Sequence, residues 1–261
     1  MRPMLSWIFF DVGNVILNDD PAQARAFVLL HRALVERGHA LSFADLLAER
    51  RALFEEQGQE PTRPYFQTLG KKHLGPEYRQ VLAGMAAEIF SRWGELSPLL
   101  PGIREVIRSL AGLYRLGIIA NQPREVVPVL KAHALWDHFE VHGISSEVGL
   151  LKPDARFFQW ALGQAGSAPE EALMIGDRLD NDILPARAMG MQTLHLVLDP
   201  AGKGYEPEDD LEKAYMAERI AGFRRPTPPL SGEGEATVTV YRVEEIPRAI
   251  ARLAAETRGG S

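Results

Sequence analysis

The sequence contains no cysteine among its 261 residues. This absence excludes a disulfide scaffold, a thiolate zinc site and a cysteine nucleophile. Long apolar runs are absent as well, because none reaches the roughly 18 residues that a membrane-spanning helix requires. The apolar stretch from Leu5 to Leu17 is interrupted by Asp11 and has no cleavage-like end, so a signal peptide is not expected. We therefore expect a cytoplasmic protein that has no membrane partner.

Basic residues are fewer than acidic residues. The chain has 29 Lys and Arg residues against 35 Asp and Glu residues, which gives a formal charge of −6 at pH 7 without any basic block. Nucleic-acid-binding domains usually carry a basic patch, so we expect no nucleic-acid partner. The remaining composition, with 46% hydrophobic and 25% charged residues, is that of an ordinary folded protein. At roughly 150 residues per domain, the length fits one large or two modest domains.

Short apolar segments predict the strands of one sheet. They are bounded by turn residues and lie at residues 6–10, 116–120, 139–144, 172–176, 192–198 and 236–243. Segments with helical spacing separate the first five, including residues 103–114, 157–166 and 183–190. This alternation predicts an α/β fold in which helices cover both faces of a parallel sheet.

One region interrupts the alternation and predicts a second domain. Residues 18–97 contain helical patterns and no convincing strand, so we expect a small helical bundle inserted as a cap. The core domain would then comprise residues 1–17 and 98–261. Within it, residues 199–235 are polar and rich in Pro and Gly near their end, and we expect them to form a surface excursion of the core.

Polar residues follow four of the predicted strands. In chain order they are Asp11, Asn121, Lys152 and the group Asp177, Asp180 and Asp182. Ligands of open α/β sheets bind at the carboxyl ends of the strands, so these residues should share one edge. Two carboxylates about 4 Å apart repel by roughly 4 kcal/mol at an effective dielectric constant of about 20, which a divalent cation would relieve. Oxygen ligands without Cys or His favour Mg²⁺ over zinc, and Mg²⁺ with a lysine is suited to holding a phosphoryl group.

The ordered segments FFDVGNVIL, IIANQ, LLKPD and IGDRLDND resemble the motifs of the haloacid dehalogenase-like (HAD) superfamily. The helical insertion after the first motif is similar to that of the subclass with a helical cap at this position. The resemblance extends from about Leu5 to Leu198. It implies a Rossmann-like core with a mobile cap. It also implies Mg²⁺-dependent phosphoryl transfer through an aspartyl-phosphate, usually on small phosphate esters.

The resemblance also implies roles for individual residues. Asp11 matches the family nucleophile and a metal ligand, and the backbone carbonyl of Gly13 matches a second ligand. Asp177 matches an acidic metal ligand, and Asp182 matches the carboxylate that supports the metal shell. Lys152 matches the lysine that neutralises the nucleophile and the phosphate. The implied partner is therefore a small phosphorylated substrate.

Two positions depart from the family pattern. Gly13 replaces the aspartate that protonates the leaving group, and Ala120 replaces the Ser or Thr that binds the phosphoryl group. Acid–base assistance contributes roughly 10² to 10⁴ in rate, and a hydrogen bond to a charged group contributes about 1.5 to 3 kcal/mol. A leaving group of low pKa, or a proton from Asp19 or Asp20, would compensate. The candidates for contacts with the substrate are Gly13, Asn14 and Asn121.

These departures leave alternatives to the phosphatase hypothesis. A non-catalytic relative that binds a phosphorylated ligand or a protein is the second hypothesis. A metal-free dehalogenase is the third, and it is disfavoured because Asp177 and Asp182 retain the pattern that holds a metal. Three nearby residues receive structural interpretations: Asp180 as a helix N-cap, His195 as a core residue, and Lys203 as a residue without a role, since its two flanking glycines lack the context of a P-loop.

Overall fold

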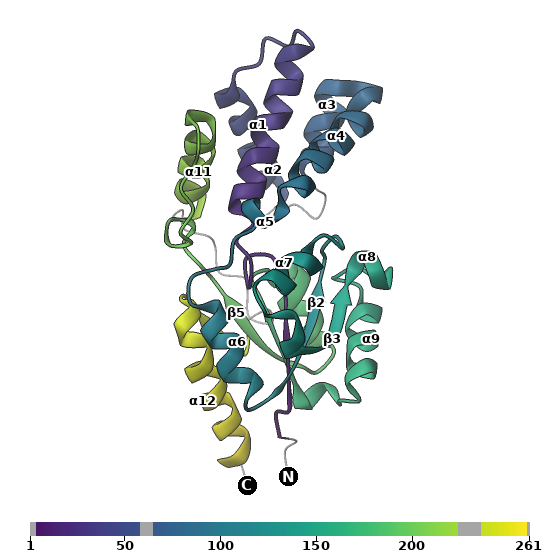
Figure 1. The fold of residues 1–261 in the computed structure, drawn as a ribbon, viewed down its shortest axis with the longest axis vertical. Coiled ribbons are helices and arrows are strands. Elements are labelled where there is room, and N and C mark those ends of the chain that lie inside the picture. Colours follow the sequence, from purple (N-terminus) through teal and green to yellow (C-terminus); the bar gives the residue numbers. More distant parts are fainter. Residues whose placement is uncertain (1–3, 58–64, 224–235, 260–261) are drawn as a thin grey trace. The chain divides into compact units, whose positions relative to one another are not determined.

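The computed structural model describes residues 4–57, 65–223 and 236–259. Contacts divide these residues into two compact units (Figure 1). The core unit contains the described residues of 1–18, 98–204 and 229–261, and the helical unit contains those of 19–97 and 205–228. Each unit has its own buried interior.

A six-stranded parallel sheet forms the centre of the core unit. The strands are β1 (Trp7–Phe10), β2 (Arg115–Ala120), β3 (Phe139–Ile144), β4 (Ala172–Gly176), β5 (Gln192–Leu196) and β6 (Val238–Val240). Their order is β3-β2-β1-β4-β5-β6, and every neighbouring pair is parallel. Every residue of β1 and β4 is buried, as expected of strands that are covered on both faces. The α/β fold predicted from the sequence is confirmed.

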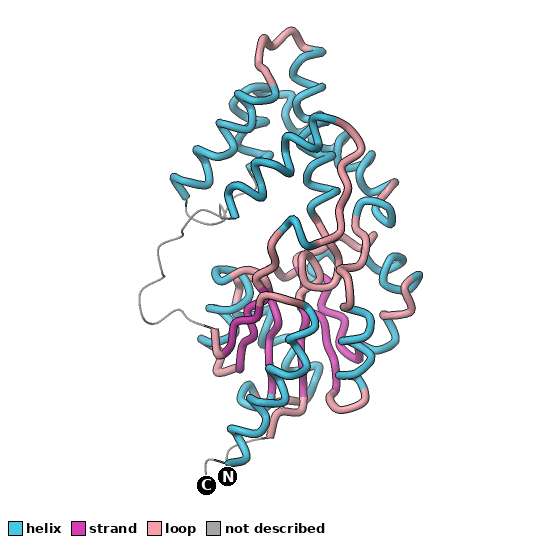
Figure 2. Tube along the Cα trace, turned by 90° about the vertical axis from the view of Figure 1, so that its left-hand side faces the viewer, coloured by secondary structure: helices cyan, strands magenta, loops and turns pink. Residues whose placement is uncertain are grey.

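Helices cover both faces of this sheet (Figures 1 and 2). They are α6 (Ile103–Ala111), α7 (Val126–Ala132), α8 (Ser145–Val148), α9 (Ala155–Ala165), α10 (Leu184–Ala188) and α12 (Ile246–Gly259). On one face, Phe157 and Phe158 of α9 share a buried cluster with Phe9 and Met174 of the strands. Helices α6 and α12 lie together on the other face (Figure 1). Short 3-10 turns lie at Trp136–His138, Pro169–Glu171, Pro200–Gly202 and Val243–Glu245.

The helical unit is built around an aromatic interior. Its helices are α1 (Asp20–Glu36), α2 (Phe43–Gln57), α3 (Tyr65–Leu74), α4 (Tyr78–Ser91), α5 (Trp93–Leu96) and α11 (Asp210–Phe223), with a 3-10 turn at Gly75–Glu77. The ring of Phe27 lies 5.6 Å from that of Phe43 and 5.5 Å from that of Tyr215. Among the described residues, no helix has the length and apolar character needed to cross a membrane.

Helix α11 departs from the predicted division of the chain. The sequence assigned residues 199–235 to an excursion of the core, whereas α11 packs into the helical unit. The side chain of Tyr215 is completely buried there, and Arg219 donates a 2.8 Å hydrogen bond to the carboxylate of Asp20 at the start of α1. The polar composition of α11 concealed the few apolar residues that anchor it. Residues 224–235 of the predicted excursion lie outside the described residues.

Candidate active site in the core unit

The register of the sheet brings three chain segments to one edge. Phe10 of β1 pairs with Ile118 of β2 and with Ile175 of β4, so the residues that follow these strands emerge side by side. The backbone N–H of Asp11 donates to the carbonyl of Ile175 at 2.9 Å and extends this pairing by one residue. The hydrogen bonds of the sheet therefore fix the position of the Asp11 backbone independently of the contacts of its side chain.

Three carboxylates gather at this edge. Asp11, Asp177 and Asp182 each offer a carboxylate oxygen, and these oxygens all lie within 4.8 Å of one another. Asp182 is fully buried and Asp11 is 8% exposed. A side chain at Gly176, the last residue of β4, would overlap Asp182, so glycine at this position allows the carboxylate to lie against the strand end. The backbone N–H of Arg178 donates to Asp182 Oδ2 at 3.0 Å and helps to orient it.

Lys152 is the buried cation of the cluster. Its Nζ lies 2.7 Å from Asp11 Oδ1 and 2.6 Å from Asp182 Oδ1, and its side chain is completely shielded from solvent. The Asn121 side chain fixes the backbone of this lysine at two atoms. Asn121 Oδ1 accepts from the Lys152 N–H at 2.8 Å, and Asn121 Nδ2 donates to the Lys152 carbonyl at 2.9 Å. The loop after β2 thus holds the loop after β3 in place.

Burial and neighbouring charges act on the ionisation of this cluster. Three carboxylates lie together, and Lys152 contacts two of them, Asp11 and Asp182. Burial raises the pKa of Asp11 from 3.8 to about 6, against the attraction of Lys152, and repulsion from Asp182 adds to the increase. Burial would lower the pKa of Lys152, but its two carboxylate partners outweigh this effect and raise it, so the lysine stays protonated. A divalent cation would offset the repulsion among the carboxylates.

The donor set suits a hard cation. Carboxylate oxygens with no thiolate or imidazole ligand are typical of Mg²⁺ sites. His195 of β5 supports the cluster without adding charge: its Nε2 donates to the backbone carbonyl of Asp177 at 3.0 Å. Burial lowers the pKa of this histidine, which keeps it neutral near pH 7. These residues therefore fit a divalent metal held by Asp11 and Asp177, with Asp182 in support.

A model of the haloacid dehalogenase-like hydrolase family matches residues 5–190, which include every residue of this cluster. The chain belongs to that family. HAD-like hydrolases generally use a divalent metal, and the acidic cluster is in keeping with this property. The resemblance inferred from the sequence motifs is confirmed.

Proteins named as phosphatases and as a nucleotidase are similar to this chain. A phosphoserine phosphatase from Thermus thermophilus is 29% identical over 260 residues, which cover 82% of this chain and 99% of the relative. A glyceraldehyde 3-phosphate phosphatase from Pyrococcus abyssi is 30% identical over 194 residues, or 73% of this chain and 81% of the relative. Pyrimidine 5'-nucleotidase YjjG from Escherichia coli is 29% identical over 196 residues, or 73% of this chain and 85% of the relative.

Solved structures of HAD-like proteins share the fold. The HAD-hydrolase YfnB from Bacillus subtilis, whose crystal structure contains magnesium, superposes with a TM-score of 0.63 at 19% identity. The match covers 95% of this chain and 99% of that chain. A HAD family hydrolase from Deinococcus radiodurans, solved with phosphate and sodium, gives a TM-score of 0.60 at 21% identity and covers 98% of both chains.

The positions at which this HAD-like hydrolase departs from the family motifs have clear structural settings. Ala120 is completely buried at the end of β2 and offers no hydroxyl. Both polar atoms of the Asn121 side chain are engaged by the backbone of Lys152. Asn121 therefore positions Lys152. The sequence also suggested a hydrogen bond from Asn121 to a phosphoryl group, and that bond would have to use the second hydrogen of the Asn121 amide. Asp20, considered as a source of a proton, is buried in the helical unit and paired with Arg219.

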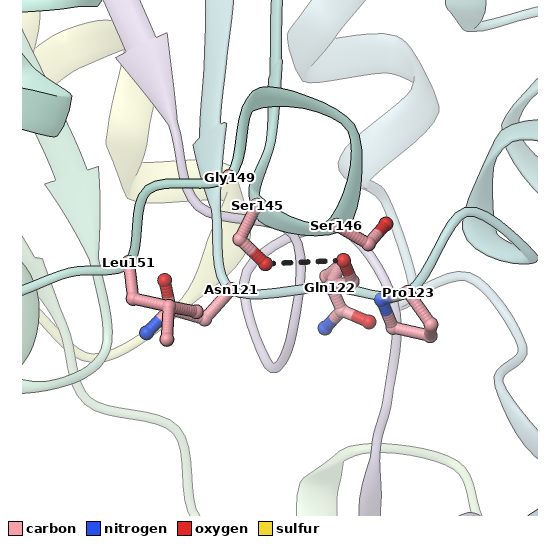
Figure 3. A pocket seen from close by; sticks show the side chains of 7 residues that line it. All are labelled: Asn121, Gln122, Pro123, Ser145, Ser146, Gly149 and Leu151. Carbon is pink, nitrogen blue, oxygen red and sulfur yellow. Dashed lines mark hydrogen bonds between the residues drawn. The ribbon is translucent and has the colours of Figure 1, made fainter.

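A hollow of about 480 Å³ adjoins Asn121 at the carboxyl ends of β2 and β3 (Figure 3). It is lined by Asn121, Gln122, Pro123, Ser145, Ser146, Gly149 and Leu151. The hydroxyl of Ser145 donates to the Gln122 carbonyl at 3.2 Å and closes one side of it (Figure 3). This hollow provides room next to the residue that holds Lys152.

Three residues near the site differ from their interpretation in the sequence. Asp180 does not cap a helix, because a π-helical turn at Leu179–Ile183 begins before it and its carboxylate pairs with Arg178 at 2.7 Å. His195 is more than a core residue, since it holds the carbonyl of Asp177. Lys203 is buried and donates a 2.8 Å hydrogen bond from Nζ to Asn14 Oδ1. The position of Lys203 shortly after a predicted strand was the signal that could have revealed it.

Proposed function

We propose that this HAD-like hydrolase is a magnesium-dependent phosphatase of a small phosphorylated metabolite and acts through an aspartyl-phosphate on Asp11. One observation carries the proposal: Asp11 and Asp182 share the buried ammonium group of Lys152 beside Asp177. Two of the relatives described above are named as phosphatases and the third as a nucleotidase, which supports chemistry on phosphate esters. Their different substrates leave the metabolite itself to be identified.

In the proposed reaction, a carboxylate oxygen of Asp11 attacks phosphorus and the bond from phosphorus to the ester oxygen breaks. The displaced oxygen carries away the electron pair of that bond; an alcohol leaving group takes a proton from solvent, and the carboxylate released from an acyl phosphate needs none. Water then hydrolyses the aspartyl-phosphate, which regenerates Asp11 and releases inorganic phosphate. Lys152 keeps Asp11 oriented and offsets the negative charge that develops on the phosphoryl oxygens.

The metal would be held by Asp11, Asp177 and the backbone carbonyl of Gly13, and Asp182 would fix the surrounding shell. Mg²⁺ at this position supplies positive charge that offsets the repulsion between the nucleophile and an anionic substrate. Asn14 and Asn121 border the phosphoryl position in this proposal, and the hollow beside Asn121 accommodates part of the substrate. We further propose that the helical unit acts as the cap, because it is inserted directly after Asn18 in the loop that follows Asp11.

The side chains that are missing at Gly13 and Ala120 would restrict which phosphate compounds the enzyme can hydrolyse. Without an acidic side chain at residue 13, the enzyme has less help in protonating the leaving group. We therefore propose a substrate whose leaving oxygen has a low pKa, such as an acyl phosphate or a sugar-1-phosphate. Rates should fall by about 10² to 10⁴ between p-nitrophenyl or acetyl phosphate and simple alkyl phosphates, because that is the usual contribution of a general acid.

The test is Asp11→Asn, assayed with Mg²⁺ against a panel of phosphate esters that spans this range of leaving groups. Turnover of every ester should disappear, because the amide cannot form the covalent intermediate. Asp180→Asn is the matched control: it removes an exposed carboxylate that pairs with Arg178, and its turnover should stay close to that of the wild type. Retained activity in Asp11→Asn would refute the assignment of the nucleophile.

A second function is favoured by the same two positions. Gly13 and Ala120 remove two of the groups that assist turnover and leave the charged cluster in place, which suits a protein that binds a phosphorylated ligand without hydrolysing it. Absence of turnover across the whole ester panel, together with Mg²⁺-dependent binding of a phosphate compound, would favour this reading over the phosphatase.

A further inference from the structure

Lys203 is a second buried lysine in the core unit, and the proposed mechanism does not use it. It follows the short turn at Pro200–Gly202, in the connection after β5, and is 5% exposed. Its Nζ donates a 2.8 Å hydrogen bond to Asn14 Oδ1, three residues beyond the nucleophile. Burial of an ammonium group is costly in free energy, so a buried lysine at this position is expected to have a specific structural or functional role.

The residue that Lys203 contacts, Asn14, has an unusual backbone conformation. Asn14 has φ +54°, in the left-handed region that few residues other than glycine adopt and that asparagine tolerates best. Its N–H donates to the carbonyl of Leu17 at 2.7 Å and closes a tight turn. The φ of Asn14 sets the plane of the peptide that joins Gly13 to Asn14, and the carbonyl of Gly13 belongs to this peptide. Whatever holds Asn14 therefore orients that carbonyl.

Lys203 touches the same turn at a second point. Its own carbonyl accepts a 3.3 Å hydrogen bond from Asn18 Nδ2, and Asn18 is completely buried. The N–H of Asn18 donates in turn to the carbonyl of Pro98 at 2.7 Å. The hydrogen bond from the Asp11 N–H to Ile175 of β4 fixes the start of the segment from Asp11 to Asn18. Lys203 holds the rest of this segment through Asn14 and Asn18.

We propose that Lys203 is a positioning residue for the metal site: through Asn14 it holds the turn after the nucleophile so that the Gly13 carbonyl faces the cation. This inference rests on the proposed function only in that a divalent cation binds beside Asp11. Glycine has no side chain with which to secure its own peptide, and its backbone is more free than that of any other residue. The hydrogen bond from Lys203 to Asn14 supplies the conformational restraint that Gly13 lacks.

The first measurement is Mg²⁺ affinity in the full-length protein, by isothermal titration calorimetry and by the Mg²⁺-dependent rise in melting temperature. Lys203→Met keeps an unbranched side chain, one atom shorter, but removes its charge and its donor. It should weaken Mg²⁺ binding by about 10-fold to 100-fold, the usual effect of losing a group that orients a metal ligand. Lys203→Arg retains a donor and should recover part of the loss. Lys131→Met, which alters an exposed lysine of α7, is the control and should bind Mg²⁺ like the wild type.

A double-mutant cycle tests whether Lys203 acts through Asn14. Asn14→Gly keeps access to positive φ and removes the side chain that Lys203 contacts. It should weaken Mg²⁺ binding by itself, and adding Lys203→Met to it should have little further effect. If Lys203→Met weakens binding equally in both backgrounds, the lysine acts by its charge and the positioning role is wrong. Unchanged Mg²⁺ affinity in folded Lys203→Met would also overturn the proposal.

These readouts separate the inference from the proposed function. If the wild type hydrolyses no ester but Lys203→Met still weakens Mg²⁺ binding through Asn14, the phosphatase fails and the positioning role stands. If the wild type is active and Lys203→Met matches it in both turnover and Mg²⁺ affinity, only the positioning role fails. For an active enzyme, the variant should lose turnover at low Mg²⁺ and regain it as Mg²⁺ is raised, which a merely unstable protein would not do.

Discussion

The core unit and the helical unit both bury charged side chains, but they balance them differently. In the core, Asp11 and Asp182 share the ammonium group of Lys152, and the carboxylate of Asp177 lies beside them. In the helical unit, the buried carboxylate of Asp20 lies 2.8 Å from the guanidinium of Arg219. The guanidinium of Arg50 lies over the rings of Tyr65 and Tyr215, at 5.1 Å and 4.9 Å from their centres.

The difference separates a candidate metal site from a structural ion pair. Burial of charge costs several kcal/mol per ion unless a partner compensates for the lost hydration. The ion pair of the helical unit is compensated within the fold, and it joins α11 to a helix that lies far away in the sequence. In the core cluster, burial and the nearby carboxylate of Asp182 raise the pKa of Asp11 against the attraction of Lys152, so a cation bound there would favour the ionised form of Asp11.

Lys152→Met should have the largest effect on the core unit. It removes the ammonium group that contacts the carboxylates of Asp11 and Asp182. Turnover should fall by about 10³, the effect of losing one strong electrostatic contact at a reaction centre. The folded state should lose about 3–5 kcal/mol, because buried charges are left without their partner. Urea denaturation with and without Mg²⁺ is the measurement, and Mg²⁺ should restore part of the stability. A variant as stable as the wild type without Mg²⁺ would contradict the charge argument.

Tyr215→Ala is the corresponding change in the helical unit. Tyr215 is fully buried beside Phe27, and truncation of an aromatic residue in such a place costs about 3–5 kcal/mol. Urea denaturation followed by circular dichroism should show this loss, and Mg²⁺ should not restore it. Lys213→Ala, an exposed position of the same helix, should change stability by no more than about 0.5 kcal/mol. Equal stability of the two variants would show that α11 does not contribute to the helical unit.

A smaller effect is expected in the pH dependence of turnover, which reports on the ionisation of Asp11 in the core unit. The pKa of Asp11 is raised to about 6, and only the ionised carboxylate is a nucleophile. At low Mg²⁺, turnover should therefore fall about tenfold per pH unit below pH 6. Saturating Mg²⁺ favours the ionised form and should move this acidic limb to lower pH. An acidic limb that does not respond to Mg²⁺ would mean that Asp11 does not contact the cation.

The same shift predicts how stability depends on pH. The folded protein holds the Asp11 proton more tightly than the unfolded chain between pH 3.8 and about 6. The contribution of Asp11 to the free energy of unfolding must then decrease as pH rises through this range. Asp11→Asn removes the titrating group, so the difference in stability between the variant and the wild type should change over this range and become constant above it.

The elements of the core and the acidic residues of its site were predictable from local sequence. The segments LGIIA and ALMIG are short and apolar, and they form the buried strands β2 and β4. Asp11 and Asp177 follow strands directly, so a parallel sheet was enough to place them at one edge. A short apolar segment that ends in a turn carries its own signal, and that signal does not depend on the rest of the chain.

The other contacts of the site were not predictable in this way. Nothing near Asn121 in the sequence indicates that its amide holds the backbone of Lys152, and nothing near Lys203 indicates Asn14 as its partner. The position of α11 shows the same limit on a larger scale, because its burial depends on aromatic residues of α1 and α3.

Residue spacing and turn residues encode the order of the strands along the chain and the chemistry at their ends, because both are short-range signals. Which buried charges lie close enough to interact depends on the three-dimensional fold. That property depends on distances of a few ångströms between residues up to 199 positions apart, such as Asp20 and Arg219. Short-range patterns in the sequence do not record such distances.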